Sequence, residues 1–201
     1  MYAVGHLALG YLTGKATGKL LNVSVSLPLL FLASVIPDID LLIPGLQHRG
    51  PTHSLIISTL IFIPLVAYYR KKAIPYFIAL TQHSLIGDYL TGGGIQLLWP
   101  LNSTNYYGLT IEITSLTNIT IEWIFFLTAF TILLKTRDAR TLLQPHPSNL
   151  LLSIPTFTVL LPTILSFPQY VPPTLIIPHL TYLIIFATSI LIDFKALLKK
   201  S

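Results

Sequence analysis

The chain has no cysteine, so it can form neither a disulfide bond nor a metal site with thiolate ligands. Charged residues are also scarce: they make up 9% of the 201 residues, whereas 53% are hydrophobic. This composition, with its strongly positive mean hydropathy, is typical of an integral membrane protein and disfavours a soluble core. The N-terminal segment has neither a basic start nor a small-residue cleavage motif, so we expect no cleaved signal peptide.

The net charge of +5 does not indicate a nucleic-acid partner, because most basic residues lie in short clusters at the ends of apolar runs. In membrane proteins such clusters mark the cytoplasmic side. If every cluster is cytoplasmic, the runs between them cross in alternating directions, and the polar segments 37–51, 92–118 and 168–173 lie outside. The clusters are Lys15 with Lys19, Arg70 to Lys72, Lys135 to Arg140, and Lys195 to Lys200.

The apolar runs predict an all-α, polytopic bundle of transmembrane helices that forms one integral domain over residues 1–201. We expect a multi-pass protein of the cell membrane, most simply a prokaryotic plasma membrane, with the lipid bilayer as its partner. Six to seven spans are predicted: seven if the first run crosses the membrane, and six if it lies flat on the membrane or re-enters it from the same side. Within the segment 95–118, which could cap a site, the alternating residues 110–114 predict a short strand. The expected spans are 2–19, 27–36, 52–69, 73–91, 119–134, 149–167 and 174–194.

A glycine stripe marks the first of these runs. Gly10, Gly14 and Gly18 are four residues apart, and His6 lies one step earlier on the same stripe. Glycines at this spacing let membrane helices approach one another closely. We therefore expect the stripe and His6 to face the interior of the bundle.

One short polar segment holds Asp38, Asp40, His48, Arg49 and His53, in a chain with only seven acidic residues and six histidines. Charge in so apolar a chain is usually paired or functional. In an extended loop, Asp38 and Asp40 would point to one side and could reach one site. Histidines and aspartates without cysteine suit a divalent metal, zinc first, with manganese or magnesium possible. Arg49 is suited to bind phosphate through paired hydrogen bonds.

The motifs resemble a family of membrane-bound, metal-dependent hydrolases associated in bacteria with a LexA-regulated inner-membrane protein. The matching elements are Gly-His at 5–6, Pro-Asp-Ile-Asp at 37–40, His-Arg-Gly-Pro-Thr-His-Ser at 48–54, His83 with Asp88, and Gly-Gly-Gly-Ile-Gln-Leu-Leu-Trp-Pro at 92–100. The resemblance covers roughly residues 1–125 and leaves 126–201 as additional transmembrane helices. The order of histidines and aspartates is also similar to that of zinc-dependent phospholipase C and the P1-type nucleases.

The resemblance implies a centre of one to three metal ions. Asp40 would be a ligand or a partner of one, and His48 and Arg49 would contact substrate or hold the loop. The implied metal ligands are His6, Asp38, His53, His83 and Asp88.

The pair His83 and Asp88 departs from the family pattern, which usually has three residues between the two instead of four. In a regular α-helix, residues five apart point about 140° away from each other. A π-bulge, or an early helix end near Gly87, would bring both side chains to one site. Otherwise one of them is not a ligand, and His83 could be a core histidine that bonds to a neighbouring helix.

Other residues also have plain structural explanations. Asp38 and Asp40 could cap a helix end. Glu122, near the start of an apolar run, could be stabilised by the helix dipole, or it could serve as an added ligand or general base.

We therefore expect a membrane-embedded, phospholipase C-like metal-dependent hydrolase with its site at the external membrane face. Its substrate would be a phosphoester or other ester of a lipid or membrane-associated molecule. The metal would activate water, His48 and Arg49 would contact substrate, and Asp40 or Glu122 would take the proton. The alternatives are a metal or ion transporter, which needs polar residues continuing toward the cytoplasm, and a non-catalytic protein with a structural metal. The sequence leaves the oligomeric state open.

Overall fold

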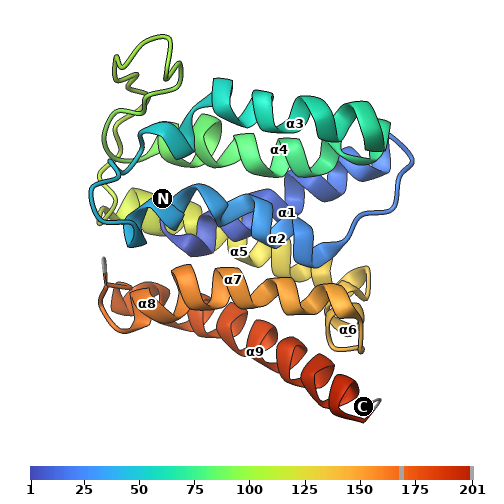
Figure 1. The fold of residues 1–201 in the computed structure, drawn as a ribbon. Helices are drawn as coiled ribbons and strands as arrows, with labels where there is room; N and C mark the ends of the chain where they lie inside the picture. The colour runs from blue at the N-terminus through green and yellow to red at the C-terminus, as the bar shows by residue number, and fades with distance from the viewer. Residues whose placement is uncertain (168–169, 200–201) are drawn as a thin grey trace.

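The computed structural model describes residues 1–167 and 170–199, and its regular structure is helical throughout that part of the chain. Helices α1 to α5 lie in the N-terminal two thirds of the chain, and α9 is the last helix (Figure 1). The α-helices are α1 (Ala3–Leu20), α2 (Leu27–Val35), α3 (Leu55–Tyr69), α4 (Ile74–Gln82), α5 (Leu116–Lys135), α6 (Asp138–Leu142), α7 (Ser153–Pro155), α8 (Leu161–Ile164) and α9 (Ile176–Leu198). The 3-10 helices are η1 (Ile36–Leu42), η2 (Pro51–His53), η3 (Arg70–Lys72), η5 (Pro147–Leu152) and η7 (Pro173–Leu175), and the π-helices are η4 (His83–Asp88) and η6 (Thr156–Leu160).

Successive helices run in alternating directions, so the bundle has two ends (Figure 1). The N-terminus and the segments 43–54 and 91–115 lie at one end. The turns that follow α1, α3 and α5 lie at the other, and α9 also runs toward it. The expected basic clusters fall at this second end, because they terminate α1, α3, α5 and α9. Lys200, predicted in the last cluster, and residues 168–169 of the predicted 168–173 segment lie outside the described residues.

Three helical stretches among the described residues are long and apolar enough to cross a membrane, and they match the last three expected spans. The other expected spans are not confirmed. The nine residues of α2 and the 15 of α3 are short for a hydrocarbon core about 30 Å thick, since a helix rises about 1.5 Å per residue. The 18 residues of α1 include His6, several glycines and two lysines, which lower its hydropathy. The three stretches are Leu116–Lys135, Pro147–Ile164 and Pro173–Leu198.

The glycine stripe of α1 faces the interior, as predicted. His6, Gly10, Gly14 and Gly18 are all buried. A methyl group at Gly10 would overlap Ser34 of α2, and one at Gly14 would overlap Leu30. The small residues therefore let α2 lie directly against α1, and this close packing brings His6 toward the segment that follows α2.

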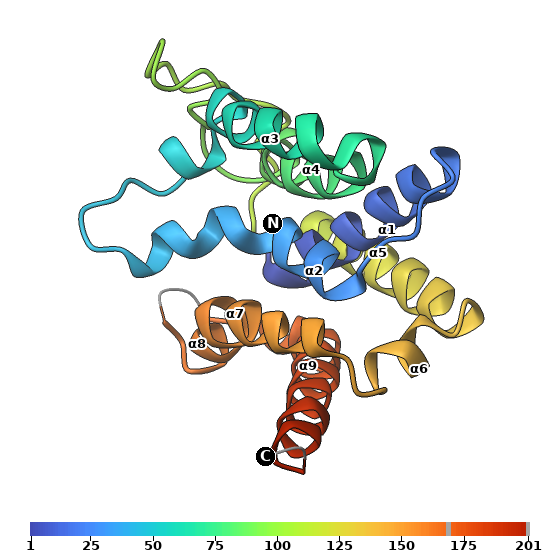
Figure 2. The same ribbon diagram turned by 45° about the vertical axis from the view of Figure 1, so that its right-hand side comes forward.

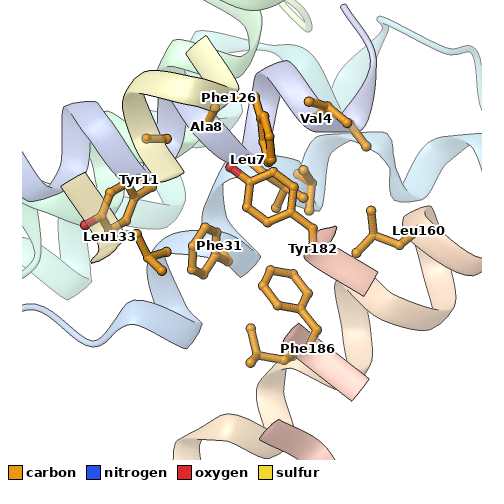
Figure 3. Packing of buried hydrophobic residues seen from close by; sticks show 14 of the residues in the cluster. Val4, Leu7, Ala8, Tyr11, Phe31, Phe126, Leu133, Leu160, Tyr182 and Phe186 are labelled. Atoms are coloured by element: carbon orange, nitrogen blue, oxygen red, sulfur yellow. The ribbon is translucent and has the colours of Figure 1, made fainter. Parts of the chain in front are cut away.

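The hydrophobic core lies where α1, α2, α5 and α9 meet. Figure 3 shows Phe31 of α2 surrounded by aromatic side chains from other helices. Its ring centroid lies 5.8 Å from Tyr11, 5.0 Å from Phe186 and 5.9 Å from Tyr182. Interlocked rings of this kind fix the relative positions of helices, because each ring has few alternative rotamers that fit. The core thus provides a rigid base behind the end that carries the polar residues.

The predicted strand at 110–114 is wrong, because the described residues there make only an isolated bridge between Thr91 and Ile111. Residues 91–99 instead lie along the segment that precedes α3. The backbone N–H of Gln96 donates to Arg49 O (2.9 Å), and the N–H of Leu55 donates to Leu97 O (2.9 Å). This part of the predicted cap therefore borders the polar end of the bundle.

Candidate metal centre

Histidines and aspartates from four helical segments meet at the end of the bundle that carries the N-terminus. His6 comes from α1, Asp38 from η1, His53 from η2, and His83 with Asp88 from η4. All five are buried. Three overlapping groups place one potential ligand atom per residue within 4.8 Å of one another: His6 with Asp38 and His83, Asp38 with His48 and His53, and His53 with His83 and Asp88. The five residues predicted as ligands are thus brought together.

The two aspartates of η1 point in different directions, unlike the expectation of an extended loop with both carboxylates on one side. Pro37 follows the end of α2, and residues 36–42 wind as a 3-10 helix. With three residues per turn, residues two apart differ by about 240°. The carboxylates of Asp38 and Asp40 consequently reach the two opposite nitrogens of one ring: Asp38 Oδ1 lies 3.7 Å from His53 Nε2, and Asp40 Oδ2 lies 3.2 Å from His53 Nδ1.

The π-helix η4 brings His83 and Asp88 onto one face. The wider turn compensates for the extra residue between them, as one of the two predicted solutions requires. His83 Nε2 lies 3.6 Å from Asp88 Oδ2. Gly87, in the same turn, leaves room for the ring of His6, which stacks on His83 with centroids 3.6 Å apart. A regular α-helix would have separated these groups.

The hydrogen bonds of His83 fix its tautomer. His83 Nδ1 lies 2.7 Å from the carbonyl oxygen of Ser34, which can only accept, so Nδ1 carries the proton. In the neutral ring Nε2 would then be an acceptor, yet it faces Asp38 Oδ1 at 3.3 Å and Asp88 Oδ2 at 3.6 Å. Lone pairs that face each other at these distances repel unless a proton or a cation lies among them. A backbone carbonyl on the far nitrogen is the arrangement usual for a metal-binding histidine.

His53 is held in a similar way. Its Nδ1 faces Asp40 Oδ2 and the hydroxyl of Thr52 (3.0 Å), while its Nε2 lies 3.1 Å from Asp88 Oδ2. Burial lowers the pKa of His53, but the adjacent carboxylates of Asp38, Asp40 and Asp88 outweigh burial and hold that pKa well above its usual value. Asp40 therefore orients His53 and does not belong to any of the three ligand groups found among the described residues.

Asp40 accepts hydrogen bonds from several residues at the more exposed side of the cluster. Its carboxylate accepts from His48 Nδ1 (2.9 Å), from Thr52 Oγ1 (2.6 Å) and from the backbone N–H of Arg49 (3.3 Å). Burial raises the pKa of Asp40, but the hydrogen bonds from His48, His53 and Thr52 outweigh it and hold the pKa below its usual value. Asp40 is thus a permanent carboxylate that holds His48, whose side chain is 33% exposed.

Arg49 is already engaged by the protein. Its guanidinium donates to Asp88 Oδ1 (2.9 Å) and to the carbonyl oxygens of Thr91 (3.0 Å) and Gly93 (2.8 Å). In this arrangement it anchors Asp88 and the start of the 91–115 segment. The expected phosphate contact would have to share or replace these bonds.

Glu122 lies apart from the ligand groups of the described residues. Its carboxylate accepts from the backbone N–H groups of Tyr2 (2.7 Å) and Gly5 (3.1 Å) and from the side chain of Asn118 (3.0 Å). These contacts fix the start of α1, and with it His6. The general-base role remains a prediction that these contacts do not require.

Several groups that contact the clustered residues were not predicted from the sequence. The amine of Met1 lies 3.6 Å from Asp88 Oδ1 and donates to Thr91 Oγ1. Ser34 contributes a main-chain carbonyl, which no residue pattern reveals. Thr52 could have been found, because it lies within the same polar motif as His48 and His53.

Unsatisfied atoms show that the residues fit a cation. Nine buried side-chain nitrogen or oxygen atoms in the described residues lack a hydrogen-bond partner, and five belong to this cluster. Such atoms are destabilising unless something binds them. Imidazole nitrogens with carboxylate oxygens suit zinc, and also manganese. The five atoms are His6 Nδ1, His6 Nε2, His53 Nε2, His83 Nε2 and Asp88 Oδ2.

Comparison with known proteins supports the inner-membrane part of the expected family. Residues 1–171 match a family described as YdjM inner membrane protein. The matched segment includes the whole cluster and continues past the expected limit near residue 125. No curated protein and no solved structure matches the chain. The three apolar helices agree with a multi-pass protein of the cell membrane. Because the match covers most of the chain, the chain belongs to the YdjM inner membrane protein family.

Proposed function

We propose that this protein is a membrane-embedded, divalent metal-dependent hydrolase of ester or phosphoester bonds. The observation that carries the proposal is the meeting of His83 Nε2 and His53 Nε2 with the carboxylates of Asp38 and Asp88. Imidazole nitrogens lie there within 3.1 to 3.7 Å of carboxylate oxygens. A site with these donors supports zinc or manganese.

A bound cation would supply Lewis acidity and a water molecule of lowered pKa. The protein's own residues prepare for that chemistry. Asp40 holds His48 through Nδ1, which leaves Nε2 of the neutral ring as a base at the rim. Arg49 positions Asp88, and Asp40 orients His53. We therefore assign proton transfer to His48 and orientation to Asp40 and Arg49.

Partial exposure on one side supports access to the centre. The side chains of His53 and His83 are 0% exposed, whereas Asp38 is 10% and His48 33% exposed. A substrate would approach from the side of Asp38 and His48. A purely structural metal is the second candidate, because the burial of the histidines is also typical of closed metal sites.

The test begins with metal content. Elemental analysis of detergent-purified protein should find stoichiometric zinc or manganese, lost in an Asp38→Ala/His53→Ala double variant that remains folded by circular dichroism. His179→Ala is the matched control, since His179 is buried but bonds to Leu160 O (2.8 Å), away from the cluster. Protein that takes up no metal, even after reconstitution, would sink the proposal.

Hydrolysis separates the two candidates. The metal-loaded protein should cleave bis(p-nitrophenyl) phosphate or a phospholipid, and His48→Gln should lower kcat while retaining the metal. If metal binds, its removal only lowers thermal stability, and no ester in the panel is cleaved, the structural candidate is favoured.

A further inference from the structure

An apolar groove of about 750 Å³ lies between α2 and α3. Its walls include Leu32 from α2, Ile36 from the start of η1, and Ile57, Ile61 and Leu65 from α3. Leu80 of α4 contributes to the lining, and α4 packs against both α2 and α3. Figure 2 shows α3 and α4 as a pair beside α2, with the 36–54 segment arching between α2 and α3. Its lining therefore runs along α3 from Ile57 to Tyr69 and reaches the 36–54 segment at Thr52.

One end of the groove adjoins the candidate metal centre. Thr52 lines it, and the Thr52 hydroxyl donates to Asp40 Oδ2 at 2.6 Å. Pro37 and Ile39 line it too, and they flank Asp38 in the chain. Residues that line the groove thus alternate along the chain with residues of the centre, and the groove ends beside the centre.

The surroundings identify the occupant. Ile61 is 55% exposed on the groove wall, and Ile63 on the same helix is 58% exposed. In an inner membrane protein an apolar surface of this kind faces the bilayer, so a groove that opens on it meets hydrocarbon chains. Ile57 and Tyr69 both line the groove, 12 residues apart on α3, a length of about 18 Å.

We propose that the groove holds one hydrocarbon chain of a membrane lipid, whose ester-linked head group then reaches the metal centre beside Thr52. This proposal rests on the proposed function and names its substrate class: a long-chain lipid ester or phosphoester that enters sideways from the bilayer. Recognition of the chain comes from Ile57, Ile61 and Leu65, and recognition of the head group comes from the centre.

The test compares two substitutions that differ only in where they point. Ile61→Trp would fill the groove, whereas Ile63→Trp is the control, since Ile63 has similar exposure and does not line it. Native mass spectrometry of the detergent-purified, metal-free proteins would follow binding of dioleoyl phosphatidic acid and its dihexanoyl analogue. We expect Ile61→Trp to weaken dioleoyl lipid binding about tenfold or more, the equivalent of two methylene groups lost from apolar contact. Ile63→Trp should match the unaltered protein, and the dihexanoyl lipid should bind more weakly to every form.

A second variant fills the groove from another helix, so the test does not depend on the folding of Ile61→Trp alone. Ala33→Leu fills the groove from α2, where Ala33 also lines it, and should weaken binding in the same direction. Equal binding of dioleoyl lipid by all four proteins would overturn the groove proposal.

Hydrolysis distinguishes the failure of this proposal from failure of the proposed function. If bis(p-nitrophenyl) phosphate is cleaved and Ile61→Trp cleaves dioleoyl phosphatidic acid as fast as Ile63→Trp, the hydrolase stands and the groove has no role. If Ile61→Trp and Ala33→Leu lose lipid and Ile63→Trp does not, while no form cleaves any ester, the lipid site stands and the hydrolase falls. Selective loss of long-chain lipid cleavage, with bis(p-nitrophenyl) phosphate still cleaved, supports both.

Discussion

His83 and Asp88 lie five residues apart, yet His83 Nε2 is 3.6 Å from Asp88 Oδ2, because the helix that carries them widens into a π-helix. A single inserted residue in an α-helix produces this geometry. The two side chains keep the relation that a spacing of four residues would give in an α-helix. The candidate centre therefore depends on the width of one helical turn.

Shortening that turn should leave the centre intact. Leu85 is partly exposed in η4, so its deletion would convert the π-helix to an α-helix and keep His83 and Asp88 on one face. Zinc content should be unchanged by elemental analysis. An alanine inserted after Leu85 should instead turn Asp88 by about 100° and abolish stoichiometric zinc. Equal metal content in the two variants would contradict the role of the π-helix.

Gly87 should be intolerant of a side chain. A methyl group there would overlap the ring of His6, which stacks on His83. We expect Gly87→Ala to weaken zinc binding about tenfold or more, as a displaced partner of a metal site does. Gly93→Ala is the matched control, because a methyl group at Gly93 meets nothing within 4 Å. Competition titration with a fluorescent zinc chelator measures both, and identical affinities would refute the packing argument.

Asp40→Asn should weaken zinc binding by about ten- to a hundredfold without removing a ligand. The amide has half the acceptor capacity of the carboxylate, so it cannot hold His48, Thr52 and His53 together. Asp193→Asn provides the control: Asp193 is buried and accepts from the His146 N–H (2.6 Å) in another part of the fold. Complete loss of zinc in Asp40→Asn would make Asp40 a ligand instead.

Metal affinity should rise with pH. The surrounding carboxylates hold the pKa of His53 well above its usual value in the metal-free protein, so His53 is protonated at neutral pH. Metal binding must displace that proton, and below the raised pKa each unit of pH should strengthen binding about tenfold per proton released. Above that pKa the gain stops. Calorimetric titration at pH 6, 7 and 8, in buffers of different ionisation enthalpy, reports both affinity and proton release; affinity independent of pH would contradict the arrangement around His53.

Much of the centre could be predicted because it depends on residue type and helical spacing. The stripe from His6 to Gly18 faces the interior, as four-residue spacing in a helix requires. The concentration of scarce charge between residues 38 and 53 correctly indicated where the chain gathers its buried polar groups. The choice of a π-helix at His83 was one of two predicted alternatives, and only the backbone could decide between them.

The remaining features depend on three-dimensional contacts that the residue pattern does not contain. The direction of Asp40 follows from the 3-10 winding of η1, which separates it from Asp38. The bonds of Arg49 to Thr91 O and Gly93 O involve main-chain atoms, which have no signature in sequence. Only three of the six to seven expected spans are confirmed as long, apolar helices in the described residues; a run such as 52–69 is not, because it includes residues outside the helix, here α3.

The four segments that meet at the centre have a mechanical consequence. The ligand groups in α1, η1, η2 and η4 are spread from His6 to Asp88, so a cation bound there would be a cross-link between four distant points of the chain. This chain has no cysteine and cannot make a covalent link. Loop closure by a metal restricts the unfolded chain as a disulfide does, and it is reversible. Chelation should therefore loosen the N-terminal helices first, while α5 and α9, which supply no ligand, stay packed.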